Sequence, residues 1–302
     1  MHLNTRSKFL YWYSALLAVF TCLTILPAPD KATLVKYHLT TLDVRLLSVT
    51  LIIPEAIIWF VALFGAESLQ RYSRLIKGGA EGKQVHTLAR GLFLLAIGMP
   101  LASIFSAALN VVTVHRPSFK ATAVIIQNYV NLVFPLAAFL FISAGSRGLT
   151  DLRKARPRLL MLNMVIGAVT ILGIVFCSLI TVAHHALRTK YHMSPELVML
   201  TLGIPYVYMW FLGLLACTEL QAYTHTVEGI VYRRSWNLLI IGLTAVIMIS
   251  ILLQYLSTLA SWLDSLSLDW VLVLLYVLLL IYGAAFIVLA LGTKRLAKIE
   301  EA

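Results

Sequence analysis

One acidic residue stands out in this chain because it lies inside a long apolar run. Glu55 is the only Asp, Glu, Lys or Arg between residues 46 and 66. Burying a charge in a bilayer costs at least about 2.5 kcal/mol, so such residues commonly face a cavity or bind a partner. Glu55 is therefore the first candidate for a ligand-binding residue.

Amide and hydroxyl side chains form a second group of candidates. Gln127, Asn128 and Asn131 follow one another in a later apolar run, and Gln127 and Asn131 share a helical face at i, i+4. Ser106 and Asn110 form a similar i, i+4 pair. Such groups in a membrane helix either hydrogen-bond to a neighbouring helix or line a polar cavity. Both interpretations stay open from the sequence.

Together these side chains predict a polar ligand-binding pocket that opens to the outer side of the membrane. The predicted lining is Glu55, Asn110, Gln127, Asn128, Asn131 and Tyr206. The alternative is a structural, protonated carboxyl, in which Glu55 donates a hydrogen bond to a neighbouring carbonyl, for example one freed by a proline kink.

Eight apolar runs must position these residues. They cover residues 9–27, 46–66, 91–113, 122–144, 159–183, 197–217, 236–257 and 270–292. A helix needs about 20 apolar residues to cross a bilayer, and its backbone groups must be satisfied internally. We therefore expect an all-α, polytopic integral membrane protein with eight transmembrane helices. The longest connection, at about 66–90, leaves no room for a soluble domain.

The charge distribution predicts the orientation. Only 12% of the residues are charged, and the formal net charge is +11. If the N-terminus is cytoplasmic, 17 of the 24 Lys and Arg residues fall on the inner side. The positive-inside rule then predicts a cell-membrane protein with both termini in the cytoplasm. The basic segment 147–158 is expected to contact anionic lipid, and no nucleic-acid partner is expected.

The chain also shows an internal repeat of four spans, with a first unit at 1–150 and a second at 151–302. Pro54 and Trp59 recur 151 residues later as Pro205 and Trp210. Gly98, Ser106 and Asn110 match Gly242, Ser250 and Gln254 at an offset of 144. A four-span unit enters and leaves on one side, so the copies should be related by a pseudo-twofold axis along the membrane normal. Glu55 corresponds to Tyr206, and these two side chains could hydrogen-bond across that axis.

Motifs for catalysis, metals and cofactors are missing from the sequence. There is no phosphate loop, HExxH or GxSxG motif, so no cofactor or metal is expected and an enzyme is disfavoured. The four-plus-four plan loosely resembles the membrane prenyltransferases. Their Asp-rich magnesium motifs are replaced here by single carboxylates, Glu67 and Glu219, which cannot bridge magnesium to a diphosphate.

Three classes of function follow from these observations. The first is a carrier or small-ligand-binding membrane module with its polar pocket in the first repeat. The second is a non-catalytic membrane subunit, sensor or assembly factor, in which the polar residues only join helices and a membrane protein partner is bound. The third, less favoured, is an intramembrane lipid-modifying enzyme with a cleft near Glu67 and Glu219.

Overall fold

The computed structural model describes residues 5–25, 40–76, 79–183, 194–262 and 268–301. Within these ranges the chain is helical and contains no strand. The all-α class predicted from the sequence is therefore confirmed.

The helices are long and follow one another with short connections. Their bounds are α1 Thr5–Ile25, α3 Thr41–Leu75, α4 Ala80–His115, α5 Lys120–Leu152, α6 Leu159–Ala183, α8 Pro195–Val198, α9 Ile204–Thr226, α10 Ile230–Trp262 and α11 Leu268–Glu301. A 3-10 turn, η1 Pro117–Phe119, precedes α5, and a π-helical segment, η2 Met199–Gly203, joins α8 to α9.

Seven helical segments in the described ranges are long and apolar enough to cross a membrane. They are α3, α4, α5, α6, the α8–α9 segment, α10 and α11. Helix α1 contributes a shorter apolar segment, Tyr13–Ile25. These helices support a multi-pass membrane protein, while the eighth span stays a prediction.

The helices extend beyond the apolar runs. Helix α3 continues to Leu75 and α4 already begins at Ala80, so the connection predicted at 66–90 is itself mostly helical. At its other end α3 begins with a capping box, in which Thr40 Oγ1 accepts from the Asp43 backbone N–H at 3.2 Å and Asp43 Oδ2 accepts from the Thr40 N–H at 2.8 Å. Hydropathy therefore locates the membrane segment but not the helix ends.

The two prolines matched by the repeat sit in different backbone environments. Pro54 lies inside the continuous helix α3. Pro205 lies in the first turn of α9, directly after the π-helical segment Met199–Gly203. A π-helical turn changes the direction in which the following side chains point, and such turns are common next to functional sites. Tyr206 is the residue that follows this turn and Pro205.

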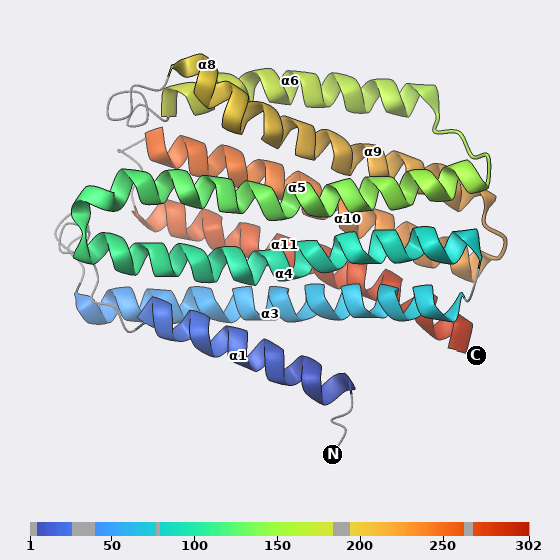
Figure 1. The fold of residues 1–302 in the computed structure, drawn as a ribbon, viewed down its shortest axis with the longest axis horizontal. Helices are drawn as coiled ribbons and strands as arrows, with labels where there is room; N and C mark the ends of the chain where they lie inside the picture. The colour runs from blue at the N-terminus through green and yellow to red at the C-terminus, as the bar shows by residue number, and fades with distance from the viewer. Residues whose placement is uncertain (1–4, 26–39, 77–78, 184–193, 263–267, 302) are drawn as a thin grey trace.

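The long helices lie side by side along one axis of the molecule (Figure 1). Helix α4 packs against α5, and α10 packs against α11. Helix α11 also packs against α3, and α5 packs against α9. Helix α1 lies against α3 and α4, and α6 lies against α9 and α10 (Figure 1). Six helices, α3, α4, α5, α9, α10 and α11, therefore surround the centre of the bundle.

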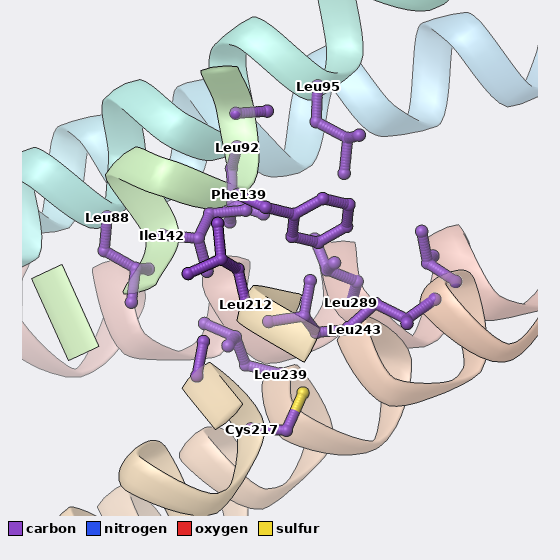
Figure 2. Packing of buried hydrophobic residues seen from close by; sticks show 14 of the residues in the cluster. Leu88, Leu92, Leu95, Phe139, Ile142, Leu212, Cys217, Leu239, Leu243 and Leu289 are labelled. Carbon is purple, nitrogen blue, oxygen red and sulfur yellow. The ribbon is translucent and has the colours of Figure 1, made fainter. Parts of the chain in front are cut away.

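A layer of buried leucines and other apolar side chains fills part of this centre (Figure 2). Leu88 and Leu92 come from α4, Leu239 and Leu243 from α10, and Leu289 from α11. These helices approach closely, because a Cβ atom added at Gly242 would lie 2.5 Å from the backbone N of Leu289. Small residues that allow such contacts are the usual basis of helix packing in membranes.

Candidate functional site

A cavity of about 250 Å³ lies among the six central helices. Its polar lining consists of Glu55 from α3, Ser103 from α4, Asn131 from α5, Ser250 and Gln254 from α10, and Tyr282 from α11. Apolar side chains, among them Trp59 and Leu279, complete the wall. A largely apolar cavity with a few convergent polar groups is the usual form of a small-molecule site.

Glu55 is the only acidic or basic residue in this lining. It lies 14 residues after the first residue of α3, or about 21 Å along the helix, and so close to its middle. Its carboxyl group hydrogen-bonds with Ser103. The second oxygen, Oε2, is buried and has no hydrogen-bond partner within the described ranges. A buried acceptor without a partner costs about 1–3 kcal/mol, so this oxygen is available to a donor group from a ligand.

Tyr282 from α11 also lines the cavity and contacts two other helices. Its hydroxyl donates to the sulfur of Met99 at 3.7 Å and lies 3.5 Å from Ser250 Oγ. Because Met99 belongs to α4 and Ser250 to α10, Tyr282 connects three helices at the cavity wall. Tyr282 therefore contributes to the shape of the site, whereas Glu55 contributes its carboxyl group.

Only some of the residues predicted from the sequence reach the cavity. Glu55 and Asn131 line it, whereas Asn110 is exposed at the surface of the bundle and is not part of the lining. Gln127 is half-buried, and its Nε2 donates to Ser106 Oγ at 2.6 Å, joining α5 to α4. Gln127 therefore makes the interhelical hydrogen bond that was the alternative to a cavity role. Whether Glu55 and Asn131 bind a ligand stays a prediction.

Tyr206 and Asn128 lie next to the cavity and contact each other. Tyr206 is buried, and its hydroxyl donates to the backbone carbonyl of Asn128 at 3.3 Å. Tyr206 also hydrogen-bonds with the side chain of Gln254. The hydroxyl is thus bonded to Asn128 and Gln254, whereas Glu55 bonds with Ser103. The hydrogen bond that the sequence allowed between Glu55 and Tyr206 is therefore not among those that these two residues form.

Four polar lining residues were not among the predicted site residues. Ser250 and Gln254 were recognised as a polar i, i+4 pair, but the sequence left their role open. Ser103 lies one turn before Ser106 on the same helix, and this spacing was the available signal. Nothing in the sequence marks Tyr282 as a site residue, since a tyrosine in a membrane helix can equally be a packing residue.

The residues between the cavity and the two ends of the bundle differ in polarity. Toward the end predicted to lie outside, the half-buried polar residues Ser106 and Gln127 follow the lining residues Ser103 and Asn131 along α4 and α5. Toward the opposite end, buried apolar residues such as Leu92 and Leu243 close the bundle (Figure 2). The polar residues beyond the cavity lining on α4 and α5 therefore lie toward the predicted outer side.

The carboxylates considered for an enzyme do not line the groove found beside α9. Glu219 is buried, and its Oε2 accepts from Ser146 Oγ at 2.8 Å. A groove lies beside α9 at Thr218 and Gln221, but neither Glu219 nor Glu67 lines it. In the described part of the chain no three His, Cys, Asp or Glu residues are grouped as they would be to hold a metal ion.

Known proteins add no identification to this geometry. The chain matches no protein-family model, no curated protein and no solved structure.

Proposed function

We propose that this protein is a membrane carrier, or a small-ligand-binding membrane module, whose site is the central cavity. The observation that carries the proposal is the buried Glu55 Oε2, which has no partner within the described ranges and lies in the wall of a cavity of about 250 Å³. The ligand class that fits is a small molecule with an N–H or O–H donor for Glu55 and an apolar body for the rest of the wall. An amine with a short hydrocarbon group meets both requirements.

The proposal includes two four-helix repeats, and the helix contacts support this arrangement. The pairs α4–α5 and α10–α11 occupy corresponding places, as do α5–α9 and α11–α3. The closest approaches correspond as well. A Cβ at Gly91 would lie 2.7 Å from the Ala138 carbonyl oxygen, and a Cβ at Gly242 would lie 2.5 Å from Leu289 N. Gly91 and Gly242 are 151 residues apart, like Pro54 and Pro205.

This packing supports a different register for α4 and α10 from the offset of 144 inferred above. With an offset of 151, Ser103 corresponds to Gln254, and both line the cavity. The hydrogen bond between Glu55 and Ser103 then corresponds to the one between Tyr206 and Gln254. We therefore propose that both repeats build the cavity, rather than the first repeat alone. A site between two parallel repeats suits a carrier, because one repeat can rock against the other around it.

A cysteine-accessibility experiment tests the proposal. With Cys22 and Cys177 replaced by alanine, Ser250→Cys should react from outside intact cells with a membrane-impermeant methanethiosulfonate. We expect labelling at least about tenfold faster than for Ile53→Cys, whose side chain is exposed on the outer surface of α3 and should face lipid. The reason is that charged reagents reach a thiol through water but not through hydrocarbon.

The same preparation separates the functional classes. Labelling of Ser250→Cys from outside, and from inside in inverted vesicles, would support a carrier. Labelling from outside alone would support a binding module. If Ser250→Cys reacts no faster than Ile53→Cys from either side, the cavity is closed to water and the proposal is wrong.

The orientation of the chain is a separate prediction. With both termini in the cytoplasm, a green fluorescent protein fused after Ala302 should fold and fluoresce. Ser118→Cys, in the exposed turn between α4 and α5, should be labelled on intact cells, and Gly79→Cys, between α3 and α4, should not. Labelling of Gly79→Cys but not of Ser118→Cys would show that the chain has the opposite orientation.

A further inference from the structure

A second hollow lies at the end of the bundle predicted to face the cytoplasm. It is a groove of about 280 Å³ between the connection that precedes α6 and the last turns of α9. Its lining includes Arg156, Arg158, Met161, Gln221, Ala222 and His225. The groove is far along α9 from the central cavity, because His225 follows the cavity residue Met209 by 16 residues, or about 24 Å.

The polar part of this groove is basic. Arg156 and Arg158 are exposed, and neither forms an ion pair in the part of the chain that the structure describes. His225 is also exposed, and the residues that line the groove include no Asp or Glu. Two unpaired guanidinium groups beside an imidazole suit a phosphate group, which Arg can bind through two parallel hydrogen bonds.

The apolar part of the groove continues onto the outer surface of α6. Met161 lines the groove, and Leu159, Leu160 and Met164 nearby are 75%, 72% and 63% exposed. Such exposed apolar residues on a membrane helix face lipid chains. The groove thus lies where basic side chains at the membrane surface meet an apolar helix face.

We propose that this groove is a binding site for an anionic phospholipid. The phosphate lies between Arg156, Arg158 and His225, and one acyl chain runs along α6 past Leu160 and Met164. A free phosphate ion uses only the basic part, whereas a phospholipid uses both parts. The site is independent of the central cavity and of the function proposed for it.

The bound lipid would also link the start of α6 to the end of α9. Helix α6 lies at the edge of the bundle and packs against α9 and α10. Its first residue follows Arg158 directly. A phosphate held by Arg156, Arg158 and His225 would tie the start of α6 to the end of α9. We therefore expect bound lipid to hold α6 in place.

Native mass spectrometry of the full chain tests this site, with phosphatidylglycerol and phosphatidylcholine as probes in equal amounts. The wild type should retain one phosphatidylglycerol in preference to phosphatidylcholine. Because each Arg near the membrane surface contributes about 1 kcal/mol toward an anionic lipid, Arg156→Gln with Arg158→Gln should lower this retention about tenfold or more. Lys83→Gln with Arg90→Gln is the matched control, since it removes two exposed cations from the same face. It should change retention less than about twofold, because neither residue lines the groove.

A steric variant keeps the result interpretable if the double arginine variant does not fold. Ala222→Leu retains every charge but fills the groove, and it should also lower phosphatidylglycerol retention. Equal losses in both double variants would mean diffuse charge attraction and would overturn the site. So would full retention in Ala222→Leu. Complete displacement of the lipid by millimolar inorganic phosphate would assign the groove to a free phosphate ion instead.

Discussion

Gly242→Ala is expected to destabilise the protein by about 1–3 kcal/mol, although alanine is normally the better helix residue. The added Cβ would lie 2.5 Å from the backbone N of Leu289 and 2.7 Å from its Cα. These are backbone atoms of α11, so the two helices must move apart and the leucine layer between them loosens (Figure 2). The measurement is the temperature at which half of the protein is lost from the monodisperse peak in detergent.

Gly167→Ala is the matched control for this substitution. Apart from the backbone of its own helix, no atom lies within 4 Å of a Cβ added at Gly167 in α6, so the variant should be neutral or gain less than about 1 kcal/mol. Gly91→Ala should behave like Gly242→Ala, because its Cβ would lie 2.7 Å from the carbonyl oxygen of Ala138. If Gly242→Ala is as stable as Gly167→Ala, the close packing of α10 on α11 is refuted. A penalty at Gly242 without one at Gly91 would count against the proposed register of the repeats.

Glu55→Leu is expected to stabilise the ligand-free protein by about 1–3 kcal/mol. Leucine has a similar size, and it removes a buried oxygen that has no partner within the described ranges. Ser103 can instead hydrogen-bond to a carbonyl of its own helix, as serines in membrane helices commonly do. Proteins often keep such costly groups where a ligand needs them, so a gain in stability with a loss of binding marks a functional residue. The unfolding temperature in detergent measures the gain.

Two variants control the Glu55 experiment. Glu67→Leu removes a carboxyl from the same helix at a position that does not line the cavity, and it should give no comparable gain. Glu55→Gln keeps the polarity and size of the side chain, so it should change stability by less than about 1 kcal/mol. If Glu55→Leu instead destabilises the protein by 1 kcal/mol or more, Glu55 joins helices structurally. That result would contradict the proposal that Glu55 accepts a hydrogen bond from a ligand.

Hydropathy along the chain identified the apolar helices but not the faces that they bury. Trp59 is 3% exposed, whereas its neighbours Ile57 and Phe60 are 55% and 38% exposed. In a soluble protein the exposed positions would be polar, and their period would reveal the buried face. In a membrane both faces are apolar, because lipid is as apolar as the protein interior. The rotation of each helix about its axis therefore cannot be predicted from its hydropathy.

The candidate site shows the consequence. Asn110 and Ser103 both lie on α4 as polar residues of an apolar helix, yet only Ser103 lines the cavity. The two are seven residues apart, about 10 Å along the helix, so their depth decides which one reaches Glu55. The same distance separates the two registers considered for α4 and α10. Matching residue types pairs Asn110 with Gln254, whereas the proposed register pairs Ser103 with Gln254. Residue types discriminate poorly between two such registers, because most positions in both helices are apolar.

The sequence by itself determined that the chain is helical, that it has the apolar segments of a multi-pass membrane protein, and that Glu55 is an exceptional residue. These properties depend on composition within one segment, which is local in the chain. Only the tertiary structure decided that Ser103, Gln254 and Tyr282 share a cavity with Glu55, and that Tyr206 bonds to Asn128 and Gln254. These properties depend on the depth and rotation of six helices relative to one another. In a bilayer those two quantities are set by packing between side chains from distant segments.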